Sequence, residues 1–555
     1  MTLTIGLHGV PDPTGRLRIH DHGMAVMRDG RVVWASELER RSRVKHDGAM
    51  PDHVEAWLTP WLHDREEVRL ALVNGFLGAR LESSGRRLRV DGAATLTAAD
   101  ALVECDVTQS LVPGAPLRAF TVAHEAAHLG TCLAMFGAFR PGSLLVHVDG
   151  GASVSNASAW HYDGSSLRCI EHAWHPTLKG AVNNFNANPL SRAILGLRDS
   201  EHLAMPGKLM GLAAYGEPEP DVLASLIEHD FYREASDSSV GLALNGTIGR
   251  RSLATLSPHD RASHVVAACM QHHLEEELLA YIGRHVSATG ARHLYFSGGA
   301  ALNVHANRRL ERELPVDGLY VPPAPSDAGL ALGAAAFLTW RLDGRAHAHG
   351  PFLNTLSPTD VPASLASSAR PSRLTHARDV AAAIAEGAVI GVFAGDGELG
   401  PRALGHRSLL CRADSIPLRR RVSETMKKRE WYRPVAPLMT AEVAAQWLEP
   451  GARASGLADW MLGAYRVTPD GGSGLAGAVH VNGSVRAQIV RPGARGLAHM
   501  EDLLDVLERE HGLSAVINTS FNRSGEPIVH RASEAGETAR RLGLDAIWDV
   551  GGCAP

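Results

Sequence analysis

Hydrophobic residues occur along this chain in short runs that end at glycine or polar turns. Residues 3–7, 143–148, 294–297 and 389–393 form four such runs. A short apolar run bounded by turn residues fits a strand that is covered on both faces. Helical segments follow several of these strands, so the pattern predicts an α/β fold.

The segment from residue 124 to about residue 136 predicts a helix with two histidines on one face. It is rich in Ala, Leu and Met, which favours a helix, and the spacing of His124 and His128 lets both rings share a cation. Imidazole suits zinc, iron, copper or nickel, with further ligands from elsewhere in the fold. Glu125 completes the HExxH pattern of metalloproteases. A metalloprotease, or two histidines without a metal, therefore stay as alternatives here.

A change of composition divides the chain. Residues 341–376 are rich in Pro, His, Ser and Thr and show little periodicity, which indicates a linker or boundary. We therefore expect a first domain at 1–350, a linker at 351–376 and a second domain at 377–555, which suits a chain of 555 residues. The sequence shows no internal repeat.

The composition excludes several classes of protein. Lys and Arg number 55 against 60 Asp and Glu, and the net charge of −5 gives no electrostatic reason to expect a nucleic-acid partner. The six cysteines contain no CxxC pair, which argues against disulfides or a thiolate zinc site. The beginning of the chain has no signal-peptide pattern, and the apolar run 329–340 is too short to cross a bilayer. We expect a cytoplasmic protein without a membrane partner.

Two glycine turns in the first domain follow predicted strands and are suited to a nucleotide. In Asp149-Gly150-Gly151 the loop amides can face a phosphate and the carboxylate a cation. Ser297-Gly298-Gly299, ahead of Asn303, can hold phosphate or ribose oxygens at a helix N-terminus. Lys208 could also meet an anion.

The order of these turns suggests an actin/hexokinase-like (ASKHA) fold in two lobes. Asp327 precedes an Ala-rich helix and would be its N-cap, or would join His124, His128 and Asp149 as a fourth metal ligand. A protease needs no pair of phosphate-binding turns, which decides against the metalloprotease alternative.

Basic residues in the second domain recur within apolar sequence that glycine and proline hold in place. Guanidinium groups on such loops are suited to phosphate and carboxylate oxygens. The polar residues concerned are Arg402, Arg407, Lys427, Arg429, Arg433, His480, Arg486, Ser520 and Asn522.

These segments resemble a known family, the ATP-dependent O-carbamoyltransferases of the nodulation-protein and tobramycin type. The most specific parts are Gly400-Pro-Arg-Ala-Leu-Gly-His-Arg-Ser408, residues 427–437 and Thr519-Ser-Phe-Asn522, and the similarity covers nearly the whole chain. The resemblance implies a domain like the universal tRNA threonylcarbamoyladenosine transferase followed by a YrdC-like α/β domain.

The resemblance also implies a two-step reaction. The YrdC-like domain would combine carbamoyl phosphate and ATP, with Mg²⁺, into carbamoyl adenylate and pyrophosphate. A hydroxyl of a small-molecule natural product, an antibiotic-type secondary metabolite, would then attack the carbamoyl carbon and release AMP. The polyanions of the first step need cationic side chains around them.

Site residues follow from the same resemblance. The nine polar residues of the second domain given above would bind carbamoyl phosphate and ATP. Three of them, Arg402, Lys427 and Arg433, would also be catalytic. The nucleotide in the first domain would meet Gly150, Gly151, Lys208, Ser297, Gly298, Gly299 and Asn303. His124, His128, Asp149 and Asp327 would hold Fe²⁺ or a similar divalent metal that orients the adenylate and polarises the leaving group. His20 would be the general base for the acceptor hydroxyl.

Three other classes stay open: a threonylcarbamoyl transferase that modifies tRNA, an actin-like ATP-dependent sugar kinase, and a metal and nucleotide sensor without catalysis. The net charge weighs against the first. The chain departs from the family pattern at Ala394, Ile489 and His22. Neither the acceptor nor the oligomeric state is predicted.

Overall fold

Residues 3–320 form two sheets that share five strands with the same connectivity. The computed structural model describes residues 2–11, 19–63, 66–75, 80–92, 101–186, 189–197, 203–229, 256–356 and 371–550. The first sheet has the order β3-β2-β1-β4-β8-β7-β6-β5 and the second β11-β10-β9-β12-β13. The strands of the first sheet are β1 (Leu3–His8), β2 (Gly23–Arg28), β3 (Arg31–Glu37), β4 (Val68–Val73), β5 (Arg80–Glu82), β6 (Leu88–Asp91), β7 (Leu102–Gln109) and β8 (Leu117–Val122). Those of the second are β9 (Ser143–Val148), β10 (Ala157–Tyr162), β11 (Leu167–Ala173), β12 (His293–Ser297) and β13 (Gly318–Tyr320).

Pairing within the two sheets repeats as well. In the first sheet β1 pairs antiparallel with β2 and parallel with β4, and β4 pairs parallel with β8. In the second sheet β9 pairs antiparallel with β10 and parallel with β12, and β12 pairs parallel with β13. If the five shared strands of each sheet are numbered in chain order, with β8 as the fifth of the first sheet, both sheets have the order 3-2-1-4-5. This duplication confirms the α/β class and the two-lobed actin/hexokinase-like arrangement.

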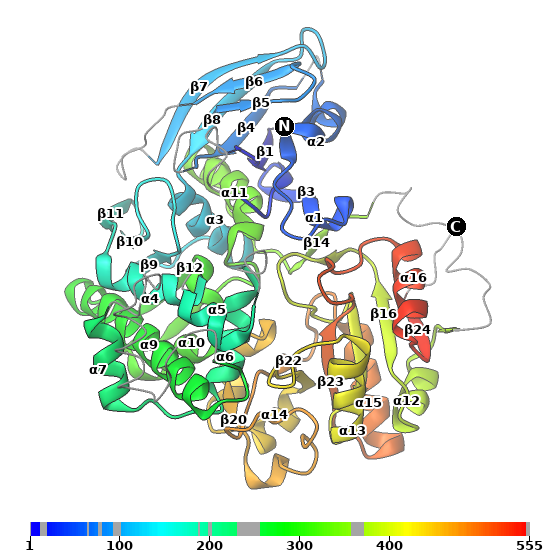
Figure 1. The fold of residues 1–555 in the computed structure, drawn as a ribbon. Coiled ribbons are helices and arrows are strands. Elements are labelled where there is room, and N and C mark those ends of the chain that lie inside the picture. The colour runs from blue at the N-terminus through cyan, green and yellow to red at the C-terminus, as the bar shows by residue number, and fades with distance from the viewer. Residues whose placement is uncertain are drawn as a thin grey trace.

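Helices α3 (His124–Phe136) and α11 (Leu330–Asp343) cross closely between the two sheets (Figure 1). Every residue of α3 from His124 to Met135 is buried. A Cβ at Gly130 would lie 2.0 Å from the carbonyl oxygen of Gly333, so only glycine permits this approach. The crossing sets the start of α3 beside the 3₁₀ turn η7 (Asp327–Gly329), which leads into α11.

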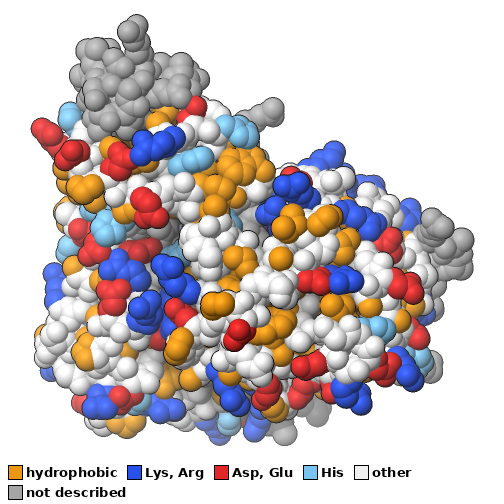
Figure 2. Space-filling view, turned by 90° about the horizontal axis from the view of Figure 1, so that it is seen from below, with side chains coloured by type: hydrophobic (Ala, Val, Ile, Leu, Met, Phe, Trp, Pro, Cys, Tyr) orange, Lys and Arg blue, Asp and Glu red, His pale blue; other side chains and the backbone are white. Residues whose placement is uncertain are grey.

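The second lobe is mainly helical around its sheet. Its helices are α4 (Pro176–Asn186), α5 (Pro189–Leu195), α6 (Met205–Ala213), α7 (Pro220–Glu228), α9 (Arg261–Thr289) and α10 (Val304–Glu313). No helix in the described part of the chain combines the length and the apolar composition needed to cross a membrane. Acidic and basic side chains are interspersed on the face seen from below (Figure 2).

A separate seven-stranded mixed sheet fills the C-terminal part, in the order β15-β24-β16-β18-β23-β19-β22. Its strands are β15 (Ser372–Leu374), β16 (Ile390–Ala394), β18 (Ser408–Arg412), β19 (Ala436–Thr440), β22 (Gln488–Val490), β23 (Ala515–Ser520) and β24 (Ala546–Val550). Among its helices are α12 (Ala377–Ala385), α14 (Ala441–Trp447), α15 (Ala498–His511) and α16 (Ala532–Leu542).

The segment expected to be a linker, 351–376, contains two strands in its described part. β14 (Phe352–Asn354) pairs with β17 (Gly397–Glu398), and β15 belongs to the C-terminal sheet. Residues 357–370 lie outside the described residues.

Candidate metal centre and anion site

The four residues expected to bind a metal form one connected cluster, in which His128 approaches both Asp327 and Asp149. Nε2 of His124 lies 3.1 Å from Nε2 of His128. Oδ1 of Asp327 lies 3.4 Å from the first nitrogen and 3.5 Å from the second. Oδ2 of Asp149 lies 3.6 Å from Nε2 of His128. His124, His128 and Asp327 are within reach of one cation, and His128, His147 and Asp149 form a second such group. Imidazole and carboxylate ligands of this kind suit a divalent transition metal.

Neighbouring backbone and side chains fix the position of these ligands. The amide of His124 donates to Oγ of Ser153 (2.8 Å) at the start of α3. Asp149 follows β9, and its two oxygens accept hydrogen bonds from the amides of Gly150 and Gly299 (2.5 Å each). The two predicted glycine turns therefore meet at one carboxylate, at the edge where both parent strands end.

The charges of this cluster stabilise one another. Burial alone would raise the pKa of Asp327, but the positive charge of His124 outweighs it and holds that pKa well below its usual range. Burial likewise opposes the charged form of His124, yet Asp327 raises its pKa overall.

His147 is a further candidate ligand that the sequence reasoning missed. It lies in β9, stacks on His128 with ring centroids 5.0 Å apart, and is within reach of a cation shared with His128 and Asp149. Its Nε2 is buried and has no hydrogen-bond partner among the described residues. A histidine inside an apolar strand, two residues before Asp149, was the available signal.

Glu125 does not take part in this cluster. Its Oε1 accepts hydrogen bonds from the amides of Val154 (2.9 Å) and Ser155 (3.0 Å) and from the Ser155 hydroxyl (3.0 Å). A carboxylate occupied in this way holds the 153–155 loop, which agrees with setting the metalloprotease alternative aside.

His20 forms a hydrogen-bonded pair with the next residue. Its Nδ1 lies 2.9 Å from Oδ2 of Asp21. Burial alone would lower the pKa of His20, but the hydrogen bond and charge of Asp21 outweigh it and raise the pKa to about 9. At neutral pH the imidazole is therefore mostly protonated, in contrast to the neutral ring expected from the sequence, and only its deprotonated fraction can act as a base.

A second cluster, in the C-terminal domain, is strongly cationic. Arg402, Arg429, Arg433 and Arg486 act on one another by charge repulsion. Burial, with repulsion from Arg433, lowers the pKa of Arg402 to about 10 and that of Arg429 to about 9. These side chains are only half-buried, so protein surrounds them on most sides while solvent still reaches them.

The geometry of this arginine cluster fits a polyanion. The buried Nε atoms of Arg402 and Arg486 have no hydrogen-bond partner in the described part of the chain. One carboxylate, Glu430, lies 3.6 Å from Arg433. Repelling guanidinium groups with free donors are stabilised by phosphate oxygens between them.

Lys427, Ser520 and Asn522 form one wall beside the arginine cluster. Nζ of Lys427 donates to Oδ1 and to the carbonyl of Asn522 (2.7 Å each) and contacts the carbonyl of Ser520. Arg429 donates to the hydroxyl groups of Thr519 (2.8 Å) and Ser520 (3.2 Å). Burial and repulsion by Arg429 hold the pKa of Lys427 well below its usual range.

Two predicted anion ligands of this domain have other partners. Arg407 is fully buried and donates to the carbonyl groups of Ala394 (2.6 Å) and Gly395 (2.8 Å), over the ring of Phe393. Its guanidinium is thus used to brace the backbone and does not face the arginine cluster as expected. Nε2 of His480 contacts the carbonyl of Tyr432 (3.0 Å). This ring nitrogen is therefore also used in a contact with the backbone.

Three predicted nucleotide ligands of the first domain are likewise committed elsewhere. Nζ of Lys208 lies 2.6 Å from Oε1 of Glu430. The Asn303 side chain accepts from the amide of Ala306 and caps α10. The Ser297 hydroxyl contacts the Thr131 hydroxyl (3.1 Å) and a backbone carbonyl. Gly298, with φ 101, permits the turn itself because a Cβ there would lie 2.2 Å from a carbonyl oxygen.

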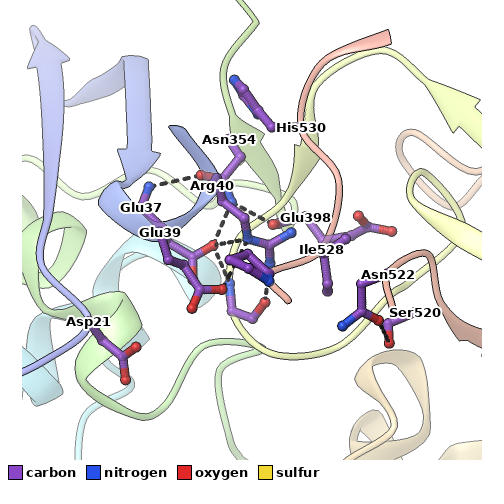
Figure 3. Close-up of polar contacts among 12 residues, drawn as sticks. Asp21, Glu37, Glu39, Arg40, Asn354, Glu398, Ser520, Asn522, Ile528 and His530 are labelled. Carbon is purple, nitrogen blue, oxygen red and sulfur yellow. Dashed lines mark hydrogen bonds and ion pairs between the residues drawn. The ribbon is translucent and has the colours of Figure 1, made fainter. Parts of the chain in front are cut away.

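Residues at the domain boundary also shape the site and were not predicted. Oε2 of Glu37 accepts from the side-chain amide of Asn354 (2.6 Å) and lies 3.2 Å from Nε of Arg40 (Figure 3). Arg40 donates to the carbonyl of Gly400 (2.7 Å). The first lobe is thereby fastened to the loop that carries Arg402.

Glu398 orders that same loop from inside. Its Oε1 accepts hydrogen bonds from the amides of Leu404 (2.7 Å), His406 (2.8 Å) and Arg407 (3.0 Å). Glu398, in the segment Gly395-Asp-Gly-Glu-Leu-Gly400, is therefore a structural anchor for the loop.

Lys45 is exposed but feels the charge of the arginine cluster. Partial burial and repulsion by Arg433 and Arg429 lower its pKa, while Glu39 and Asp21 oppose the shift.

Comparisons with known proteins agree with these observations. The family description "Carbamoyltransferase N-terminus" matches residues 127–336, and "Carbamoyltransferase C-terminus" matches residues 381–551. Over 553 residues the chain is 28% identical to nodulation protein NolNO of Sinorhizobium fredii, covering 95% of this chain and 78% of that protein. Over 524 residues it is 28% identical to 3'-hydroxymethylcephem-O-carbamoyltransferase of Streptomyces clavuligerus, covering 93% of each. Nodulation protein NolO of Bradyrhizobium diazoefficiens is 32% identical over 360 residues, 61% of this chain and 64% of that protein.

Proposed function

Because this chain belongs to the carbamoyltransferase family, we propose that it is an ATP-dependent enzyme that transfers a carbamoyl group to a hydroxyl of a small-molecule natural product. The observation that carries this proposal is the presence of two different sites in one chain. One is an arginine cluster suited to polyanions, and the other is a His/Asp cluster suited to a metal. The name of the cephem relative supports an antibiotic-type acceptor that bears a hydroxymethyl group.

The arginine cluster would serve the first step. A carbamate oxygen attacks the α-phosphorus of ATP. The bond between this phosphorus and the oxygen that bridges to the β-phosphorus breaks, and pyrophosphate leaves. Carbamoyl phosphate supplies the carbamate after its phosphate is released by water, since the adenylate retains no phosphorus from it. Arg402, Arg429, Arg433 and Arg486 would offset the repulsion between the two anions, with Mg²⁺ on ATP. Lys427 would hold Ser520 and Asn522 in position.

The His/Asp cluster would serve the second step. His124, His128, Asp149 and Asp327 would hold Fe²⁺ or a similar divalent cation, which as a Lewis acid would stabilise negative charge on phosphate oxygens. The amide of Gly151 would face the adenylate phosphate, whereas those of Gly150 and Gly299 hold Asp149. His20 would accept the proton of the acceptor hydroxyl as AMP leaves.

The division into domains belongs to the same proposal. Residues 1–350 would form the transfer domain and residues 377–555 a YrdC-like adenylate-forming domain. A cytoplasmic setting would supply ATP and carbamoyl phosphate to both.

Mass-spectrometric detection of carbamoyl adenylate tests the first step. Purified protein would be incubated with ATP, Mg²⁺ and carbamoyl phosphate without an acceptor. We expect the adenylate, pyrophosphate and inorganic phosphate, and each should depend on all three components. In parallel incubations, ADP formation on addition of a sugar would favour a sugar kinase, and carbamoylation or threonylcarbamoylation of added tRNA would favour a tRNA-modifying enzyme.

A further inference from the structure

The loop between α1 (Leu38–Ser42) and α2 (Met50–Leu58) holds two residues in an uncommon backbone conformation. Arg43 has φ 64 and His46 has φ 56. Arg43 is the left-handed C-cap of α1, and histidine is among the non-glycine residues enriched in this region. The chain therefore turns sharply here, and contacts with neighbouring segments fix the direction of the loop.

Contacts of this kind exist on both sides of the loop. Arg43 donates through its two terminal nitrogens to the carbonyl groups of Ile528 (2.7 Å) and Pro527 (2.9 Å) in the C-terminal domain. The amide of His46 donates to Oε2 of Glu39 (2.9 Å). The loop is thus fixed between the C-terminal domain and the first lobe. In Figure 3, Ile528 lies near Asn522, and Asp21 lies on the opposite side of the view.

Held in this way, His46 completes a chain of three side chains. Nδ1 of His46 lies 2.8 Å from Oδ1 of Asp21, and Nδ1 of His20 lies 2.9 Å from Oδ2 of the same carboxylate. Asp21 is itself left-handed, with φ 57. Among the described residues, Nε2 of His20 has no hydrogen-bond partner. A single carboxylate therefore orients two imidazoles, and one of them keeps a free nitrogen.

We propose that His46 is a positioning residue for carbamoyl transfer and acts on His20 through Asp21; this inference rests on the proposed function. In the transfer step the acceptor oxygen bonds to the carbamoyl carbon. The bond from that carbon to the phosphate oxygen breaks, and AMP leaves with the electron pair. The acceptor proton moves to Nε2 of a neutral His20, a form whose share grows as the pH rises toward about 9, the pKa of this residue. Asp21 holds the proton on Nδ1 and stabilises the imidazolium that forms, as a carboxylate does beside a catalytic histidine.

The role of His46 follows from the second oxygen of that carboxylate. Without a donor at Oδ1, Asp21 can rotate, and its left-handed backbone loses a contact that holds it. His20 would then sample other ring orientations and tautomers. Because Arg43 ties the same loop to the C-terminal domain, the orientation of the base depends on how the two domains are joined.

A matched pair of variants separates the hydrogen bond from the backbone conformation. Glycine and asparagine both tolerate positive φ, so neither His46→Gly nor His46→Asn adds strain. Only asparagine keeps an N–H donor near the place of Nδ1. Val44→Ala, at an exposed position of the same loop, serves as the control.

Two assays report on the two steps. Exchange of labelled pyrophosphate into ATP, with carbamoyl phosphate present, measures adenylate formation. AMP release with methanol as the probe acceptor measures transfer to methanol and to water together. We expect His46→Gly to keep the exchange rate, to lower AMP release about tenfold and to change its pH profile. His46→Asn should recover most of the lost rate, and Val44→Ala should change neither assay.

Three results would overturn this inference. AMP release by His46→Gly with wild-type rate and pH profile would remove the positioning role. An equal fall of exchange and AMP release in both His46 variants would assign a structural role instead. Loss of one bound metal ion on His46→Gly would mean that His20, Asp21 and His46, which are within reach of one cation, form a metal site. No exchange in the wild-type protein would contradict the proposed function itself.

Discussion

Nζ of Lys208 in α6 lies 2.6 Å from Oε1 of Glu430, which belongs to the segment that carries Lys427, Arg429 and Arg433. The lysine is buried, and the glutamate side chain is about one-third exposed (31%). This ion pair joins the second lobe to the segment that carries part of the arginine cluster.

We therefore expect Lys208→Met to impair adenylate formation although Lys208 lies outside the C-terminal domain. The substitution leaves Glu430 without its cation, and the carboxylate would then turn toward Arg433 and reduce the positive charge offered to ATP. The KM for ATP in pyrophosphate exchange should rise several-fold. The free energy of unfolding should fall by about 1–3 kcal/mol, because one member of a partly buried pair is removed. An unchanged KM would separate this pair from the arginine cluster.

Arg402→Ala should abolish adenylate formation and leave the metal content intact. Its Nε has no partner within the described residues, so its removal withdraws positive charge from the anion site without breaking a hydrogen bond. Arg407→Ala provides a contrast, because loss of its carbonyl contacts should lower the melting temperature. Mass spectrometry of the adenylate and metal analysis of the same samples test both. Metal loss in Arg402→Ala would contradict the separation of the two sites.

His124→Ala combined with Asp327→Ala should lower the bound metal and block transfer, while pyrophosphate exchange continues. Both side chains belong to the His/Asp cluster, in which Nε2 of His124 and Nε2 of His128 lie 3.1 Å apart. Inductively coupled plasma mass spectrometry measures the metal, and AMP release measures transfer. Full retention of metal would refute the proposed ligand set. His147→Ala, measured in parallel, would report whether the third histidine is also a ligand.

The local signals of the sequence were enough to find the His/Asp cluster proposed to bind a metal. His124 and His128 share a helix face, and Asp149 and Asp327 each end a strand or open a helix, so short-range pattern brought all four into one set. The α/β class and two-lobed arrangement were also predictable from alternating strands and helices. The repeat of the 3-2-1-4-5 strand order could not be predicted, because the two sheets share a topology without a repeated amino-acid sequence.

The individual roles of polar residues were less predictable, because they depend on contacts distant in sequence. Arg407 and Arg402 lie in one motif, but only the structure shows Arg407 turned toward backbone carbonyl groups. Lys208 looked like an anion ligand because Glu430, more than 200 residues later in the chain, gave no sign of being its partner. The contacts of Lys45 and His46 could not be predicted either, since their neighbours come from other segments.

Acidic pH should destabilise the C-terminal domain through His499. Nε2 of this residue contacts the carbonyl of Gly405 (3.0 Å) in the 400–408 motif. Burial lowers the pKa of His499 to about 4, although the hydrogen bond to Gly405 opposes the shift. The folded state then binds fewer protons than the unfolded state, so this contribution is complete above about pH 6.5 and is lost as the pH falls toward 4.

His499→Gln measures this contribution, since glutamine keeps a donor but does not titrate. Between about pH 7 and pH 4.5 the wild-type protein should lose about 1–3 kcal/mol of stability relative to the variant. Urea unfolding of both proteins at the two pH values gives the difference. Parallel pH dependences would show that His499 is charged in the folded state.

The close crossing of α3 and α11 gives a final prediction. Gly130→Ala would place a Cβ 2.0 Å from the carbonyl oxygen of Gly333, so the helices must separate. Overpacking of this kind destabilises by about 1–3 kcal/mol or more. Because α3 carries His124 and α11 follows Asp327, the same shift should pull the metal ligands apart. We expect a lower melting temperature together with a lower metal content. Gly283→Ala in α9 is the matched control, because its nearest neighbour would lie at an ordinary 3.4 Å and alanine favours a helix by up to about 1 kcal/mol. If Gly130→Ala behaved like this control, the close approach of the two helices would not be what sets the ligand geometry.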